Sequence, residues 1–224
     1  MSFPVFRHVA DHAILVEFGD TFDNTVHNAV LRLDRALAAA PFAGLIEAVP
    51  AFVNLLVDFN PVVTDHPTAE RHLRQLLSTA PPYRHKTTIR EVLVCYDDDF
   101  STDLEAVAHQ SGLDRESVIK AHLSGSYDVI MYGFAPGYAY LAGVPGSLHL
   151  SRKTKPVHNI AAGSVLIAGA QCLVTTMIMP TGWWIIGRSP TRILTKDDTH
   201  PFLFDVGDSV VFRRISRAEY EVAR

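Results

Sequence analysis

The chain has 224 residues, of which 48% are hydrophobic and 20% are charged, as is usual for a globular protein. Its formal net charge of −4 argues against nucleic-acid binding, because that function requires a concentrated basic surface. The length suits one large domain or two small ones, each with enough apolar residues for a core.

The first 80 residues predict strands that alternate with helices. In chain order, the predicted elements are a strand over 13–18, a helix capped by Thr21 or Asp23, strands over 45–49 and 52–59, and a helix with Pro67 near its start. This β-α-β-β-α order is most of a ferredoxin-like unit. We expect its final strand to come from residues 88–95, after the break at Pro81-Pro82.

From residue 96 the pattern changes to short elements. Two short helices are expected first, one that ends near Gly112 and one capped by Asp114. The strands that follow are predicted over 127–132, 165–168, 172–179, 184–187, 192–194 and 209–215. Because turn residues separate them, they indicate a β-barrel or a sandwich. The predicted fold class is α+β, with a small α+β domain over residues 1–85 and a β-barrel domain with a helical insertion over residues 86–224.

One uncharged segment, residues 160–179, has the length of a membrane span. Its β-branched residues cluster on both sides of Gly169-Ala170, so we interpret it as two buried strands joined by a turn. Residues 1–10 lack the apolar core of a signal peptide. Cys95 and Cys172 have no metal-site spacing and are expected to be buried, reduced thiols. The expected location is therefore the cytoplasm, without membrane contact.

Self-sufficient catalytic motifs are not found in the sequence. It contains no phosphate-binding GxxxxGK[ST] loop, no HExxH and no GxSxG elbow. The histidines are scattered, and the run from Asp97 to Asp99 is interpreted as a solvated helix entry, so no metal site is predicted. No residue is assigned as catalytic.

The informative segment begins with the aromatic loop over residues 131–141, in which aromatics are interleaved with Gly and Pro. Pro136 fixes its φ angle, and Gly137 permits backbone conformations that are closed to other residues. Such a loop can hold the rings of Phe134, Tyr138 and Tyr140 in place for a small polar ligand. A barrel corner whose aromatic residues cap the core explains the same composition, and both interpretations stay open.

Two later elements carry further candidates. Gln171 follows the Gly169-Ala170 turn and has an amide that can donate and accept hydrogen bonds. In the run around Trp183, strand alternation puts Trp183 and Ile185 on one face, and Trp184 and Ile186 on the other. Arg188 at the strand exit can clamp a carboxylate or a phosphate, or pair with an acidic neighbour at the rim.

Taken in this order, these segments resemble the allophanate hydrolase subunit 1 family, which includes the B subunit of 5-oxoprolinase and an inhibitor of a sporulation histidine kinase. The resemblance covers almost the whole chain. The segments that carry it are 11–20, 47–51, 94–96, 133–141, 162–165, 167–169, 182–183 and 186–190. The chain departs from the family's usual Gly-Gly-Gln-Thr-Gly at the turn before Gln171, where Ala170 replaces the second glycine.

The resemblance implies a ferredoxin-like N-terminal domain and a cyclophilin-like β-barrel C-terminal domain. It also implies a non-autonomous subunit of an ATP-dependent amidohydrolase complex, of the 5-oxoprolinase or the allophanate and urea-degradation type. A homologous second subunit would complete the shared site and supply the ATP site, and the substrate would be a small amide, lactam or urea-like molecule. The candidate substrate-binding residues are Phe134, Pro136, Gly137, Tyr138, Tyr140, Gln171, Trp183 and Arg188.

Because the same family includes an inhibitor of a histidine kinase, the resemblance also implies an alternative function, that of a regulator that binds and inhibits a sensor histidine kinase. An exposed apolar or aromatic patch on the C-terminal domain would be the expected feature of such a regulator.

Overall fold

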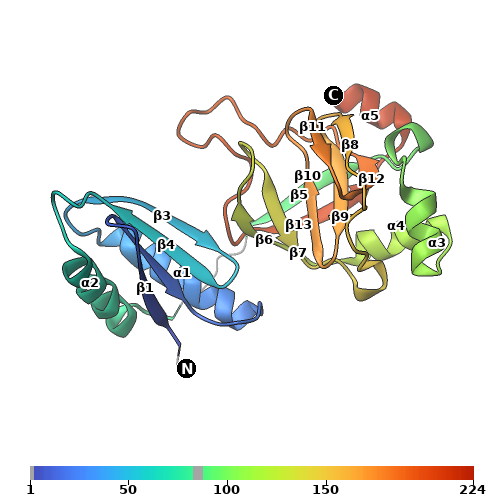
Figure 1. Ribbon diagram of the computed structural model, residues 1–224. Helices are drawn as coiled ribbons and strands as arrows, with labels where there is room; N and C mark the ends of the chain where they lie inside the picture. Colours follow the sequence, from blue (N-terminus) through green and yellow to red (C-terminus); the bar gives the residue numbers. More distant parts are fainter. Residues whose placement is uncertain (1–2, 83–87) are drawn as a thin grey trace. The chain divides into compact units, whose positions relative to one another are not determined.

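The computed structural model describes residues 3–82 and 88–224. The chain divides into two compact units, Met1–Lys86 and Thr87–Arg224 (Figure 1). The predicted domain boundary at residues 85 and 86 lies outside the described residues. None of the helices in the described ranges combines the length and the hydropathy of a membrane span.

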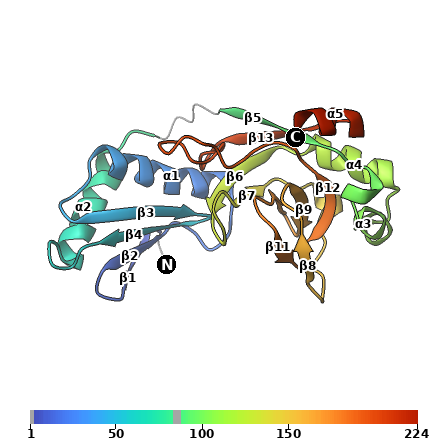
Figure 2. The same ribbon diagram turned by 90° about the horizontal axis from the view of Figure 1, so that it is seen from above.

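The first unit is a four-stranded antiparallel sheet with two helices. Its elements are β1 (Val5–Val9), β2 (Ala13–Glu17), α1 (Asn24–Ala39), β3 (Leu45–Ala51), β4 (Asn54–Phe59) and α2 (His66–Thr79). The strand order is β1-β2-β4-β3, and all neighbours are antiparallel. Figure 2 shows that both helices cover the same face of the sheet.

Local sequence explains where these helices begin. The Asp23 carboxylate accepts a hydrogen bond from the Val26 N–H at 2.8 Å, which caps α1 as one of the two predicted caps. In α2, Asp65 caps the helix and Pro67 lies in its first turn, where a missing N–H costs nothing. Both helices bury apolar side chains from one face against alternate residues of β2 and β4.

The prediction that residues 88–95 form the final strand of this unit is wrong. Residues 88–95 do not join its sheet, because β5 (Ile89–Val94) belongs to the second unit, where it pairs in parallel with β13 (Ser209–Arg214). Val92 and Val94 are completely buried there in the core of the second unit. The edge next to β2 is occupied instead by β1, which the sequence pattern did not predict.

The second unit is built on a seven-stranded sheet with the order β12-β9-β10-β7-β6-β13-β5. Its further strands are β6 (Tyr127–Tyr132), β7 (Ala139–Ala142), β8 (Val157–Ile160), β9 (Ser164–Ala168), β10 (Gln171–Val174), β11 (Met179–Thr181) and β12 (Trp184–Arg188). Its helices are η1 (Asp98–Phe100), α3 (Leu104–Ser111), α4 (Arg115–Ser124), η2 (Gly146–Leu148) and α5 (Arg217–Ala223). The predicted helical insertion corresponds to α3 and α4.

The seven-stranded sheet curls into a nearly closed barrel. At the seam between its two edges, Cys95 and Arg188 exchange backbone hydrogen bonds of 2.8 and 2.9 Å. Gly187 makes this approach possible, because a Cβ atom there would lie 2.7 Å from Val94 Cγ1 and 3.0 Å from the Cys95 carbonyl oxygen. The two edges of the barrel are thus joined through an isolated bridge.

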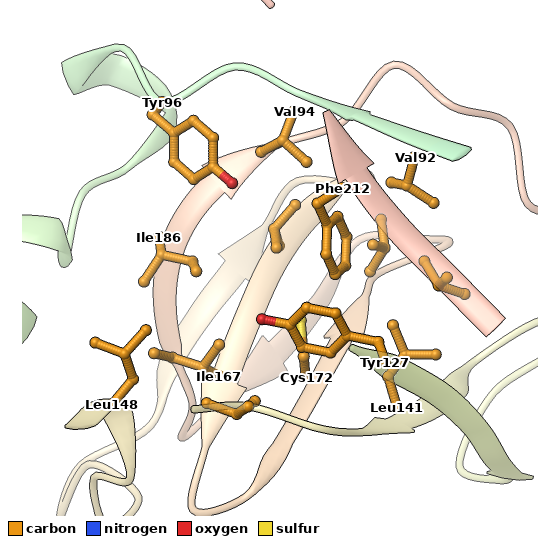
Figure 3. Close-up of a cluster of buried hydrophobic side chains, with 14 of the residues drawn as sticks. Val92, Val94, Tyr96, Tyr127, Leu141, Leu148, Ile167, Cys172, Ile186 and Phe212 are labelled. Carbon is orange, nitrogen blue, oxygen red and sulfur yellow. The ribbon is translucent and has the colours of Figure 1, made fainter. Parts of the chain in front are cut away.

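Strand alternation separates two layers of apolar side chains. Inside the barrel, residues from all parts of the sheet form the main core, which Figure 3 shows. On the other side of β9, β10 and β12, a smaller cluster lies under the two-stranded sheet β11–β8. Trp183 and Ile185 belong to this outer cluster, whereas Trp184 and Ile186 contact the inner core, which confirms the predicted alternation.

Two of the predicted strands differ from the structure. The run over 172–179 is not one strand, because β10 ends at Val174 and β11 begins only at Met179. The side chain of Thr175 turns the chain there: its hydroxyl donates to the Ala161 carbonyl at 2.9 Å and accepts from the Ser164 N–H at 2.9 Å. Residues 192–194 form only an isolated bridge between Leu194 and Phe202.

A polar side chain lies in the middle of the barrel core. His122 on α4 is fully buried, with its Nδ1 2.7 Å from the Tyr96 hydroxyl and its Nε2 3.6 Å from Cys172 Sγ. Burial lowers the pKa of His122 to about 3 and raises the pKa of the Cys172 thiol. Both cysteines are buried and free, as predicted.

Candidate functional site

A cavity of about 440 Å³ opens in the second unit. Its walls come from the turn before β9, the bend after β10, the exit of β12 and α5. The lining residues are Ala161, Ala162, Gly163, Thr175, Thr176, Ile178, Arg188, Ser189, Pro190, Thr191, Arg192, Ile193, Leu194, Tyr220 and Arg224. The volume falls within the roughly 300–1,000 Å³ of small-molecule sites.

Backbone hydrogen bonds fix the inner wall of this cavity. Gly163 donates from its N–H to the Thr175 carbonyl at 2.7 Å and accepts from the Ser189 N–H at 2.7 Å. Its φ of +81° is one that L side chains rarely adopt, and an added Cβ would lie 2.4 Å from the Ser189 carbonyl oxygen. The cavity wall therefore brings together two segments that are far apart in the sequence, 161–164 and 186–190.

The cavity carries positive charge. Arg188, Arg192 and Arg224 line it, and no Asp or Glu appears among its described lining residues. The guanidinium carbon of Arg188 lies 5.1 Å from the centre of the Phe100 ring, which holds the side chain by a cation–π contact.

The acidic partner that sequence reasoning allowed for Arg188 is not observed. Across residues 3–82 and 88–224, no carboxylate oxygen lies within 4 Å of the guanidinium groups of Arg188 or Arg192. Arg217, which also contacts the Phe100 ring, differs in this respect because it pairs with Glu221 at 2.9 Å. The N–H groups of Arg188 are thus left for another anion.

The aromatic residues of the predicted site form a continuous ledge. Ring centroids are 5.4 Å apart for Phe134 and Tyr138, 5.5 Å for Tyr138 and Tyr140, and 5.9 Å for Tyr140 and Trp183. Tyr138 and Trp183 are buried in the outer cluster, but Phe134 is 74% exposed. Burial raises the pKa of Tyr138 and of Tyr140, so both phenols stay neutral.

The aromatic loop adjoins the cavity. Thr176, a lining residue, donates from its hydroxyl to the Pro136 carbonyl at 2.7 Å. A Cβ atom on Gly137 would lie 2.7 Å from Leu194 Cδ2, so the loop backbone packs directly against the cavity wall. The ledge and the cavity are therefore neighbouring parts of one surface.

Gln171 lies away from Arg188, although its strand partner Ala142 is only two residues from Tyr140 of the ledge. It pairs with Ala168 at one end of β9, whereas Arg188 pairs with Ser164 at the other end. At about 3.3 Å per residue these ends are about 13 Å apart. Thr191 and Arg192, which line the cavity, were not predicted from the sequence.

The lining can bind but offers no evident catalyst. It contains hydroxyl groups, yet none of its described members is His, Cys, Lys, Asp or Glu, the residues that most often act as a general base. Within the described ranges, no three His, Cys, Asp or Glu side chains gather closely enough to hold a metal ion. Lys153, from the basic run beside the ledge, is neutralised by Asp103 at 2.6 Å.

Gly163→Ala tests the construction of the cavity wall. We expect it to lower the free energy of unfolding by about 3 kcal/mol or more, through backbone strain and the collision with Ser189. Gly169→Ala is the matched control, because Gly169 also has a positive φ, of +54°, but its Cβ would meet nothing within 4 Å. It should cost only about 1 kcal/mol. Denaturant unfolding measures both, and equal losses would contradict the packed wall.

Comparison with known proteins shows what the chain is similar to. The family model of the carboxyltransferase domain, subdomain C and D, matches residues 4–204. The B subunit of 5-oxoprolinase from Bacillus subtilis (strain 168) is 34% identical over 225 residues, which cover 96% of this chain and 94% of that protein. The B subunit of 5-oxoprolinase from Escherichia coli O157:H7 is 30% identical over 205 residues, which cover 91% and 93%.

Solved structures agree with this similarity. TTHA0988 superposes with a TM-score of 0.81 at 32% identity over 92% of this chain, which spans only 40% of the TTHA0988 chain. The conserved uncharacterized protein PH0987 from Pyrococcus horikoshii has a TM-score of 0.58 at 33% identity, with 96% of this chain and 100% of that chain covered. The K. lactis urea amidolyase, at 19% identity and a TM-score of 0.79, shares the fold, and the match covers 97% of this chain and 15% of that one.

Proposed function

Because the chain belongs to the carboxyltransferase domain family, subdomains C and D, we propose that it is a non-autonomous subunit of an ATP-dependent hydrolase complex that processes an amide or a lactam. The named relatives support the 5-oxoprolinase type, in which a cyclic amide is opened by hydrolysis of its C–N bond. The allophanate and urea-degradation type is the related possibility within the same family.

The observation that carries this proposal is a cationic cavity without a catalyst. Segments that carry the family resemblance, 162–165 and 186–190, meet in its wall. Its described lining offers hydroxyls and guanidinium groups but no general base. Such a surface can hold a substrate, and a second, homologous subunit would have to add the reacting groups.

We propose a role for each site residue, and the positions described above support these roles. Arg188 would hold negative charge in the cavity, and the backbone of Pro136 and Gly137 would support its wall. Phe134, which is exposed, and the half-buried Tyr140 would give the substrate an apolar face, and the buried rings of Tyr138 and Trp183 would support them. Gln171 lies at the other end of β9 from Arg188, and its role in reading the amide stays a prediction.

ATP is proposed as the co-substrate of the complex. An amide is a weak electrophile, so its hydrolysis gains from activation by phosphoryl transfer. The sequence has no phosphate-binding loop, and we place the nucleotide on the partner subunit. We also propose a cytoplasmic location, a ferredoxin-like first unit and a cyclophilin-like second unit.

Reconstitution with the cognate second subunit tests this function. We expect ADP release that rises at least tenfold when L-5-oxoproline is added, because the lactam is the group to be activated. The chain alone should release no ADP, since it lacks the nucleotide site. Equal rates with L-5-oxoproline, with urea and without any amide would contradict the proposal.

One observation supports the alternative that the chain binds and inhibits a sensor histidine kinase. Phe134 and Ile178 are 74% and 71% exposed, and Met177 and Leu194 are 38% exposed in the same region beside the cavity. This is the exposed apolar patch expected of a surface that binds another protein. Native co-purification separates the two functions: recovery of a homologous subunit supports the enzyme complex, and recovery of a histidine kinase supports the regulator.

A further inference from the structure

We infer that the cavity of the second unit binds the carboxylate group of a small organic acid, with Arg188 as the cation that clamps it. Charge is the first support. Arg188 and Arg192 line the cavity, and no carboxylate oxygen of the described residues lies within 4 Å of either guanidinium group. A bound anion would be attracted to these guanidinium groups and would reduce the repulsion between them.

The placement of Arg188 is the second support. Its backbone is fixed by the two seam hydrogen bonds with Cys95, and its guanidinium group rests near the Phe100 ring at 5.1 Å. No carboxylate of the described residues pairs with this guanidinium group, so its N–H groups are available to an anion. Because the side chain is already positioned, little conformational entropy is lost when it binds an anion.

The lining beside the arginines favours an organic acid over a bare ion. Ile178, Ile193 and Leu194 give the cavity an apolar side, while Ser189 and Thr191 bring hydroxyl groups. A molecule with a carboxylate at one end and a small carbon skeleton at the other matches this division.

Arginine pairs with both carboxylate and phosphate, and carboxylate is favoured by the further phosphate-binding groups that the described lining lacks. The planar fork of arginine forms two parallel hydrogen bonds to the two oxygens of a carboxylate. No lysine is among the described lining residues, and phosphate sites commonly add a lysine or a set of free backbone N–H groups. The Ser189 and Gly163 N–H groups in the wall are already bonded to carbonyls.

The test measures binding to the full chain by ligand-observed NMR titration. Three probes separate the chemistry: L-5-oxoproline, cyclopentanecarboxylate, which keeps the carboxylate but lacks the lactam, and 2-pyrrolidinone, which keeps the lactam but lacks the carboxylate. We expect the first two to bind and 2-pyrrolidinone to bind at least tenfold more weakly. Both acids should bind more weakly at high salt, because charge drives the contact.

Variants assign the effect to Arg188. Arg188→Gln should weaken the binding of both acids at least tenfold, as expected when a charged hydrogen-bonding partner is lost. The affinity of Arg188→Lys for the acids should fall between those of the parent and of Arg188→Gln, since lysine keeps the charge but lacks the planar pair of N–H donors. The control is Arg213→Gln, whose side chain forms an exposed ion pair with Glu91 at 3.1 Å and does not line the cavity.

Each outcome decides between alternatives. Equal binding of 2-pyrrolidinone and L-5-oxoproline, or an unchanged affinity in Arg188→Gln, would overturn the inference. Displacement of cyclopentanecarboxylate by an equal concentration of inorganic phosphate would show a general anion site and would overturn the assignment to carboxylates. Only the choice of L-5-oxoproline rests on the proposed function. If cyclopentanecarboxylate binds through Arg188 while the reconstituted complex ignores L-5-oxoproline, the carboxylate site stands and the proposed function fails.

Discussion

The free energy of unfolding is expected to fall steeply as the pH drops from 6.5 towards 3, because of His122. Burial in the barrel core lowers the pKa of this imidazole from 6.5 to about 3. Between these values the unfolded chain binds a proton that the folded chain excludes, so acid favours unfolding. The slope approaches about 1.4 kcal/mol per pH unit, and the loss sums to about 4 kcal/mol at pH 3. Urea unfolding at a series of pH values measures it.

His122→Gln is the variant that isolates this contribution. It removes the titrating group and keeps an amide that can face the Tyr96 hydroxyl, so stability between pH 6.5 and 4.5 should become nearly flat. Carboxylates with lowered pKa values, such as Asp65 and Asp114, lose their contribution only at lower pH. The raised pKa of the exposed His12 acts in the opposite sense in both proteins. Parallel pH profiles of variant and parent would contradict the role of His122.

A second large effect is a loss of stability in Tyr138→Ala, which we do not expect in Phe134→Ala. Tyr138 is 5% exposed in the outer cluster, so Tyr138→Ala should cost about 3–5 kcal/mol of unfolding free energy. Phe134 is 74% exposed, and Phe134→Ala should change stability by less than about 1 kcal/mol. Thermal and urea unfolding of the two variants give the comparison.

The same pair of variants decides between the two interpretations of the aromatic loop. The backbone of Phe134 has a φ of +71°, an unfavourable conformation for a bulky residue, and its ring is exposed nonetheless. Strain at an exposed aromatic residue is typical of a functional position. We therefore expect Phe134→Ala to fold normally and to lose most of the substrate-dependent ADP release of the complex. Full activity would leave the loop as a barrel corner.

Much of the fold follows from local sequence patterns. Capping carboxylates such as Asp23 and Asp114 lie where the helices begin, and the alternation around Trp183 separates the two apolar layers. Partnership between strands is not a local property. The alternating run of β5 is equally compatible with closing either sheet, and only its pairing with β13 decides.

The candidate site was predictable only in part, for the same reason. The aromatic loop and Arg188 stand out because Gly, Pro, aromatic and guanidinium groups each have a distinct chemistry. Gln171 also stands out, yet the antiparallel register of β9 and β10 carries it to the far end of the strand. Arg192 carries no local signal, because it lines the cavity only through the turn after β12.

The seam between Cys95 and Arg188 has a thermodynamic consequence. Arg188 belongs to the barrel through its backbone and to the cavity through its side chain, so the proposed binding in the cavity would be coupled to closure of the barrel. Such coupling is reciprocal. If the closed seam strengthens anion binding by a given free energy, a bound anion stabilises the closed seam by the same free energy. A bound substrate would therefore stabilise the closed barrel, and opening of the seam between Cys95 and Arg188 would weaken substrate binding.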